Sequence, residues 1–189
     1  MKQLLLNPFQ QFSEIPLLIF GIMATAFGSW SAMQFGIRYD GVLDMHFSII
    51  HHWNTPVIDN VIDIFCLTLF LFVAGKIVNQ KTRVVDVLTT SMVARTPLYF
   101  VPFINYDGSL SVNLLDKTLN EIQAIAMNNI AMILLAGVVA FIATIWYVAL
   151  LYNGYKTASN GKGSKSVLLF IGGLLVAEII SKILITYLN

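Results

Sequence analysis

Five long apolar runs dominate this chain and constrain its fold more than any other feature of the sequence. At a rise of ~1.5 Å per residue, each run is long enough to cross the ~30 Å hydrocarbon core of a bilayer. With 11% of its 189 residues charged, the chain has too little polar surface to cover a soluble domain. The sequence therefore predicts an all-α polytopic membrane protein, a single domain in which five transmembrane helices form a bundle. The predicted spans are residues 15–37, 57–78, 84–105, 125–152 and 165–187.

The segments around the spans predict short connecting elements. Residues 1–14 indicate a short interfacial helix, with Asn7 able to cap a turn that Pro8 begins. Residues 106–124 predict a turn at Asp107-Gly108, a hairpin-like start and then a helix. Residues 153–164 are rich in glycine, serine and lysine, so we expect a linker that is too polar to pack.

The third span carries an arginine near its middle. A guanidinium at the centre of a bilayer costs at least roughly 2.5–3.5 kcal/mol, so Arg95 requires a partner or a wet cavity. Pro97 lacks a backbone donor and frees the carbonyl of Val93, so we expect the helix to kink or loosen beside the charge. This span is therefore the candidate functional element of the bundle.

Two carboxylates lie at a similar depth in other spans. The helical rise places Asp63 ~9 Å, Arg95 ~12 Å and Glu178 ~13 Å from the outer ends of their spans, level enough to meet. These three residues form a predicted intramembrane charge cluster, which is either a polar, proton-linked pathway or a buried ion pair that fixes helix register. We favour the ion pair, because one arginine with two carboxylates leaves no spare charged relay. Lys182, four residues after Glu178, is a competing partner for that carboxylate.

The polar connection at residues 38–56 contains Asp44, His46, His51 and His52, which are residue types that bind zinc or copper. Adjacent histidines point ~100° apart on a helix, and the sequence has neither an HExxH motif nor a Cys/His pairing. We therefore predict a solvated histidine cluster that binds no structural metal.

The sequence contains no recognisable catalytic machinery. It lacks a phosphate loop, a dinucleotide fingerprint and a nucleophile elbow, and no strand precedes the Gly-Lys-Gly-Ser of residues 161–164. Cys66 is the single cysteine and lies in an apolar run, so we expect a small buried hydrophobe. A net charge of +1 gives no reason to expect nucleic acid. We predict a non-enzymatic protein with no cofactor and no nucleic-acid partner.

The basic residues outside the spans are distributed unequally between the two ends of the predicted bundle. An excess of lysine and arginine marks the cytoplasmic side of a membrane protein, so we expect a cytoplasmic N-terminus and an external C-terminus. One end carries two basic residues, Arg38 and Lys117. The opposite end carries seven: Lys2, Lys76, Lys81, Arg83, Lys156, Lys162 and Lys165.

Three motifs occur in order along the chain: Asn7-Pro8-Phe9 with Phe12, Asp86-Val87-Leu88 leading into Ala94-Arg95-Thr96-Pro97-Leu98, and Trp146 with Leu150 and Gly154. Over nearly the whole chain, they resemble the Yip (Ypt/Rab-interacting protein) domain family. The resemblance implies an integral membrane protein without known enzymatic activity, whose eukaryotic relatives act in vesicle traffic with small GTPases. The short cytoplasmic N-terminus implies a bacterial-type member, a multi-pass protein of the inner membrane.

Three functional hypotheses follow. The leading one is a structural, scaffolding or membrane-organising protein, with the bilayer around it and a second copy or another membrane protein as its partner. The alternative is a small transporter or channel that uses Arg95 with Asp63 or Glu178. A transporter needs an accessible polar route, whereas a scaffold can bury every charge. A metalloenzyme built on the loop histidines is the least favoured, and metal analysis of the purified protein would detect it.

The basic asymmetry predicts the outcome of cysteine labelling. A membrane-impermeant thiol reagent added from outside should label a cysteine placed at Asp107 and miss one placed at Lys162, because these positions lie in opposite polar connections. The reverse labelling pattern would invert the orientation.

Overall fold

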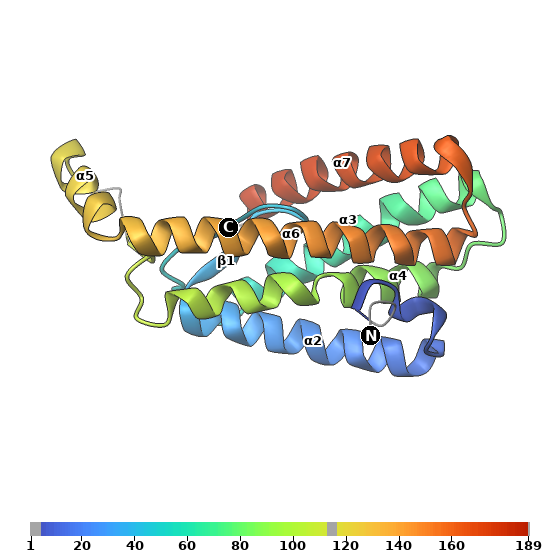
Figure 1. Ribbon diagram of the computed structural model, residues 1–189, viewed down its shortest axis with the longest axis horizontal. Coiled ribbons are helices and arrows are strands. Elements are labelled where there is room, and N and C mark those ends of the chain that lie inside the picture. The colour runs from blue at the N-terminus through green and yellow to red at the C-terminus, as the bar shows by residue number, and fades with distance from the viewer. Residues whose placement is uncertain (1–4, 113–116, 189) are drawn as a thin grey trace.

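The computed structural model describes residues 5–112 and 117–188, and it is an elongated helical bundle (Figure 1). Five helical segments of the described chain are long and apolar enough to cross a membrane, so the predicted all-α membrane bundle is confirmed. The colour gradient shows that these segments run in alternating directions along the long axis. The elements in order are η1 Pro8–Gln10, α2 Glu14–Phe35, β1 Ile37–Tyr39, β2 Met45–Phe47, α3 Thr55–Val78, α4 Val84–Ala94, η2 Thr96–Asn105, α5 Leu119–Asn128, α6 Ile130–Ser159 and α7 Gly163–Leu188.

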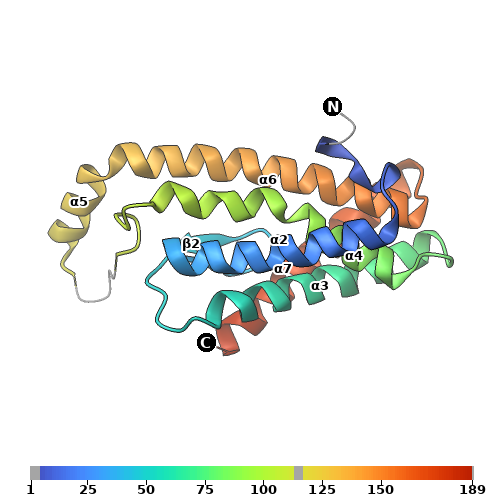
Figure 2. The same ribbon diagram turned by 90° about the horizontal axis from the view of Figure 1, so that it is seen from below.

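The third span, formed by α4 and η2, occupies the centre of the bundle. It packs against α2, α3 and α6, whereas α7 packs along α3 (Figure 2). It is also the most extensively buried of the five apolar segments. This central position allows a polar side chain on the third span to lie among protein groups instead of lipid.

The predicted break in the third span is confirmed. The α-helix ends at Ala94, and Pro97 lies in the first turn of η2, a ten-residue 3₁₀ helix that is much longer than usual. Pro97 and Pro102 have no backbone N–H, so a regular α-helix cannot continue through them. The hydroxyl of Thr96 donates to the freed carbonyl of Val93 at 2.7 Å. The break is thus compensated locally.

The expected polar connection over residues 38–56 is wrong for its first part. Residues 37–47 form an antiparallel hairpin, in which Ile37 pairs with Phe47, Arg38 with His46 and Tyr39 with Met45. Ile37, Tyr39 and Val42 are fully buried, so the hairpin folds back into the bundle. Its two strands are three residues each, too short to form without the helices that enclose them.

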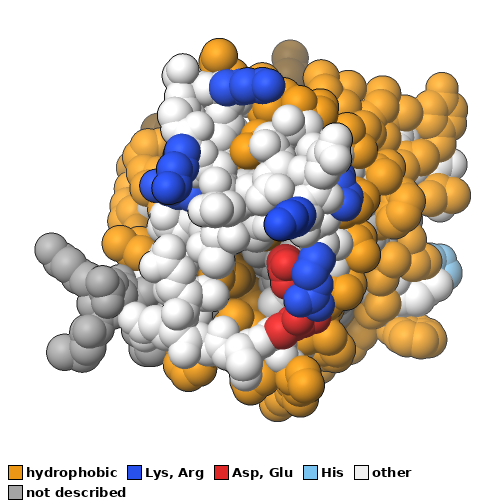
Figure 3. Space-filling view, turned by 90° about the vertical axis from the view of Figure 1, so that its right-hand side faces the viewer, with side chains coloured by type: hydrophobic (Ala, Val, Ile, Leu, Met, Phe, Trp, Pro, Cys, Tyr) orange, Lys and Arg blue, Asp and Glu red, His pale blue; other side chains and the backbone are white. Residues whose placement is uncertain are grey.

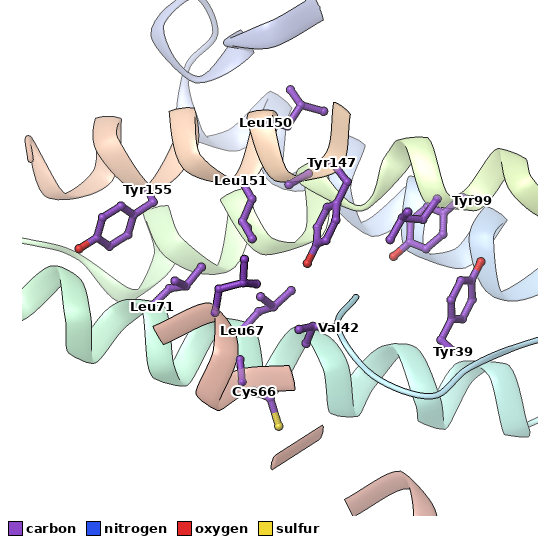
Figure 4. Close-up of a cluster of buried hydrophobic side chains, with 14 of the residues drawn as sticks. Tyr39, Val42, Cys66, Leu67, Leu71, Tyr99, Tyr147, Leu150, Leu151 and Tyr155 are labelled. Carbon is purple, nitrogen blue, oxygen red and sulfur yellow. The ribbon is translucent and has the colours of Figure 1, made fainter. Parts of the chain in front are cut away.

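The polar linker expected at residues 153–164 is reduced to residues 160–162, because α6 continues to Ser159 and α7 begins at Gly163. Tyr147, Leu151, Tyr155 and Ser159 recur every fourth residue and are all fully buried. Figure 4 shows three of these side chains in the core cluster. The spacing of four continues one helical face through a segment whose composition is polar.

Both ends of the fourth predicted span differ from expectation. Residues 119–128 form a separate helix, α5, which turns away from the bundle axis in Figure 1 before α6 begins at Ile130. The Asp107-Gly108 turn and the following helix are confirmed, since Gly108 has a φ of 74° and a Thr118–Glu121 capping box starts α5. Residues 113–116 of the hairpin-like start lie outside the described chain.

The N-terminal segment is less helical than expected. Its described part contains the three-residue turn η1, which begins at Pro8 as predicted, but the side chain of Asn7 makes no capping hydrogen bond. Residues 1–4 lie outside the description. The segment is held to α6 instead, because the indole of Trp146 donates to the carbonyl of Leu5 and the amide of Asn153 to that of Leu6, both at 2.8 Å.

One end of the bundle is markedly basic. Figure 3 views the end where α2 begins and where the turns between α3 and α4 and between α6 and α7 lie, and lysine and arginine side chains are spread across it. The described basic residues that were predicted for one side of the membrane therefore lie at the same end of the bundle. By the bounds of the elements, the basic residues at this end are Lys76, Lys81, Arg83, Lys156, Lys162 and Lys165.

The close packing of α2 on η2 gives a test of the fold. A Cβ added at Gly28 would lie 2.2 Å from the Tyr99 ring, so Gly28→Ala should lower the free energy of unfolding by about 1–3 kcal/mol. Thermal unfolding in detergent would measure the loss. Gly137→Ala is the matched control, because its Cβ meets nothing within 4 Å, and it should leave stability unchanged or slightly higher. Equal stability of the two variants would contradict this packing.

Candidate functional site

Two buried carboxylates on α3 each bind a different arginine. The guanidinium of Arg38 donates to both oxygens of Asp59, with Nε–Oδ2 at 2.8 Å and Nη2–Oδ1 at 3.1 Å. One helical turn later, Nη2 of Arg95 donates to Oδ2 of Asp63 at 2.8 Å. The Asp59 side chain is fully buried, and so are both members of the second pair. Each buried carboxylate of α3 is therefore paired with an arginine of its own.

Arg95 is the largest fully buried side chain of the described bundle. The break after Ala94 places it at the carboxyl end of α4, where the partial negative charge of a helix end favours a cation. Its Cζ lies 5.3 Å from the centre of the Tyr39 ring, and Nη1 points to the carbonyl of Val42 at 3.4 Å. The guanidinium thus contacts α3 and the hairpin at once.

Glu178, the third member of the predicted charge cluster, binds the hairpin tip. Its Oε2 accepts a hydrogen bond from the backbone N–H of Leu43 at 2.7 Å. A Cβ at Gly41 would lie 2.8 Å from the same oxygen, so the absence of a side chain there permits the close approach. Lys182 bonds to Asp44 of the hairpin, although the sequence made it a competing partner for Glu178.

The hairpin tip lies at a depth where unpaired backbone groups are costly. Glu178 is ten residues before the end of α7, or ~15 Å along the helix. The N–H of Val42 donates to Oγ of Ser181 at 3.2 Å, and the N–H of Asp40 to the carbonyl of Asp44 at 3.1 Å. Non-helical backbone at membrane depth is tolerated where protein encloses and satisfies it. These contacts define the candidate site as a re-entrant hairpin anchored by charges.

The centre of this site is closed. The side chains of Arg95 and Asp63 have no exposed surface, so no water-sized space touches them. Five polar atoms there lack a hydrogen-bond partner among the described residues: Asp63 Oδ1, Arg95 Nε and the hydroxyl oxygens of Tyr39, Tyr99 and Tyr147. The surrounding side chains would have to move before water or an ion could reach these atoms.

The three histidines of residues 38–56 do not come together in one site. His46 on β2 bonds through its ring nitrogen to Asp40, and this hydrogen bond raises the pKa of His46 above its usual value. His51 and His52 are exposed. Within residues 5–112 and 117–188, no three histidine, cysteine or acidic side chains come together as metal ligands. The absence of a structural metal stays a prediction.

Comparisons with protein-family models, with curated proteins and with solved structures found no match to this chain.

Sequence reasoning missed Arg38 and the anchoring of the hairpin. Asp59 and Asp63 are four residues apart on one helical face, which signals that two cations are needed near them. Arg38 was available for the first carboxylate, directly after the first span. The contacts of Ser181 and Lys182 with the hairpin depend on how α7 packs on α3, and no local pattern in the sequence indicates them.

The anchoring of the hairpin tip predicts a local effect of Glu178→Leu. The change leaves the N–H of Leu43 without its acceptor, so amide hydrogen exchange over residues 40–44 should accelerate by at least about tenfold. Exchange mass spectrometry in detergent would measure this. Glu121→Gln in α5 is the control, and it should leave the hairpin protected. Unchanged protection in Glu178→Leu would show that the carboxylate does not hold the tip.

Proposed function

We propose that this chain is a non-enzymatic, multi-pass membrane protein of the Yip type, with a structural, scaffolding or membrane-organising role. The observation that carries the proposal is the closed state of the intramembrane charges. Arg95 and Asp63 are paired and have no exposed surface. A transporter or channel requires a polar route that solvent can enter, and the central arginine offers none in this arrangement.

We assign these charges a structural role instead. Arg95 contacts α3 and the hairpin, and Glu178 and Lys182 on α7 contact the same hairpin. A buried ion pair that fixes the register of packed elements is a well-attested use of such groups. This network ties three spans and a re-entrant loop into one rigid unit, which suits a scaffold.

The residues behind the Yip resemblance also support the proposal, because segments far apart in sequence meet at the basic end. Phe9, Asp86 and Gly154 line one pocket there. A Cβ at Gly154 would lie 2.3 Å from Thr90 and 2.9 Å from Phe9, so this glycine permits the contact. A shared packing site is a physical reason for the three motifs to occur together.

The proposed setting is a bacterial inner membrane, with the basic end and the N-terminus in the cytoplasm and the C-terminus outside. The basic residues at the end where α2 begins support this orientation. The outward faces of α6 and α7 are apolar and exposed, as for Leu134, Phe141, Leu168 and Ile179. Such faces meet either lipid or the partner of a scaffold, a second copy or another membrane protein.

A rescue experiment separates the structural role from transport. Arg95→Met strands the Asp63 carboxylate and should lower the free energy of unfolding by roughly 3–5 kcal/mol. Adding Asp63→Leu should restore much of the loss, because both charges are then gone. Adding Glu178→Leu should not, because that carboxylate binds the hairpin instead. Denaturation in detergent would measure all three variants.

A flux assay in liposomes completes the test. The parent protein should give no ion flux above protein-free vesicles. If Arg95→Met folds normally but abolishes a flux that the parent supports, and neither double variant shows rescue, the transporter hypothesis replaces the scaffold.

A further inference from the structure

A polar pocket at the basic end of the bundle has a lining that suits a primary ammonium group. It encloses ≈ 180 Å³ between the N-terminal segment, α2, α4 and α6. Two carboxylates, Glu14 and Asp86, lie in its wall, together with the phenyl rings of Phe9 and Phe12. Aromatic faces and carboxylates both attract cations.

Three threonine hydroxyls in the lining can each accept a further hydrogen bond. Thr90 donates its proton to the carbonyl of Asp86 at 2.8 Å, and Thr157 to that of Asn153 at 2.9 Å. Each oxygen therefore keeps lone pairs for a further donor. Thr89 is 3% exposed, and its Oγ1 has no partner among the described residues. A buried hydroxyl without a partner requires an explanation, and a donor bound in the adjoining pocket would supply one.

Among residues 5–112 and 117–188, the carboxylates of the pocket outnumber the cations that bond to them. Arg83 donates to both oxygens of Glu14, at 2.8 and 2.7 Å, and lies outside the pocket lining. One arginine with two carboxylates leaves a net charge of −1 for the three. An ammonium ion supplies one positive charge and three N–H donors with no acceptor, which complements this lining.

An apolar groove adjoins the pocket. It has a volume of ≈ 460 Å³, within the range of small-molecule sites, and it shares Phe12 and Leu17 with the polar pocket. From there it extends along the bundle to Pro97 and Leu150. Its lining is apolar throughout except for Thr96, whose hydroxyl already donates to Val93. A polar cation site continuous with an apolar groove fits an amphiphile.

We propose that this composite site binds a phospholipid whose headgroup carries a primary ammonium, with the ammonium between Asp86 and the threonines and an acyl chain in the groove. The polar pocket lies at helix ends, since Glu14 is the first residue of α2 and Asp86 the third of α4, which is the level of lipid headgroups. The site lies at the other end of the bundle from the hairpin. It goes beyond the scaffold role and does not depend on it.

Successive N-methylation of the headgroup tests the proposal. Native mass spectrometry of the parent protein would compare phosphatidylethanolamine with its mono- and dimethyl derivatives and phosphatidylcholine. The charge stays constant along this series while the N–H donors disappear, so affinity should fall stepwise, by about tenfold overall. Equal affinity along the series, or preference for phosphatidylglycerol, would overturn the proposal. Equal competition by glycerophosphoethanolamine, which has no acyl chains, would exclude the groove and overturn it as well.

Variants of the lining locate the site. Thr89→Val keeps the side-chain shape and removes the unpartnered acceptor, and Asp86→Leu removes the carboxylate together with its acceptor oxygens. Each should abolish most of the preference for ethanolamine over choline. Asp107→Asn, a carboxylate at the opposite end, is the control and should keep the preference. If either lining variant folds and retains the parental preference, the ammonium is not bound here. The N-methylation series on the parent protein decides the matter if neither variant folds.

Discussion

The structure depends on one constraint: neither Arg95 nor Asp63 can be buried in the bundle without the other. Moving two charges out of water costs several kcal/mol per ion, and their attraction repays this cost only when geometry is good and further partners exist. Here the guanidinium has a 2.8 Å hydrogen bond to the carboxylate, the Val42 carbonyl and the face of Tyr39. Its position at the end of α4 adds a favourable helix dipole. Several elements thus converge on the pair, while Arg95 Nε and Asp63 Oδ1 have no hydrogen-bond partner among the described residues.

The re-entrant hairpin is the reason why α7 is polar on one side. Glu178, Ser181 and Lys182 follow the i, i+3, i+4 spacing of a single helical face, and all three bond to the segment between Asp40 and Met45. Without them, the tip would leave backbone N–H groups unpaired within an apolar bundle. The charges that the sequence places inside the last span therefore have partners in the hairpin: Glu178 binds a backbone N–H, and Lys182 pairs with the carboxylate of Asp44.

The sequence predicted features that depend on length, hydropathy and local backbone chemistry: the five spans, the break at Pro97 and the similar depth of Arg95 and Asp63. It did not predict the hairpin, because strands of three residues acquire their pairing from the helices around them. Nor did it assign Asp63 instead of Glu178 to the arginine, since depth alone does not give the rotation of a helix. The extension of α6 was missed although Tyr147, Leu151 and Tyr155 carry its spacing, because the polar composition around Gly154 suggested a linker.

The break in the third span lies between the buried ion pair and the apolar groove. Because the α-helix stops at Ala94, Arg95 faces the hairpin on one side, while Val93 and Pro97 line the apolar groove on another. A 3₁₀ helix rises ~2.0 Å per residue against ~1.5 Å for an α-helix, so replacing η2 by regular α-helix would change both the length and the rotation of everything beyond the break. The break thus places the buried charge of Arg95 and two residues of the groove wall within five positions of each other along the chain.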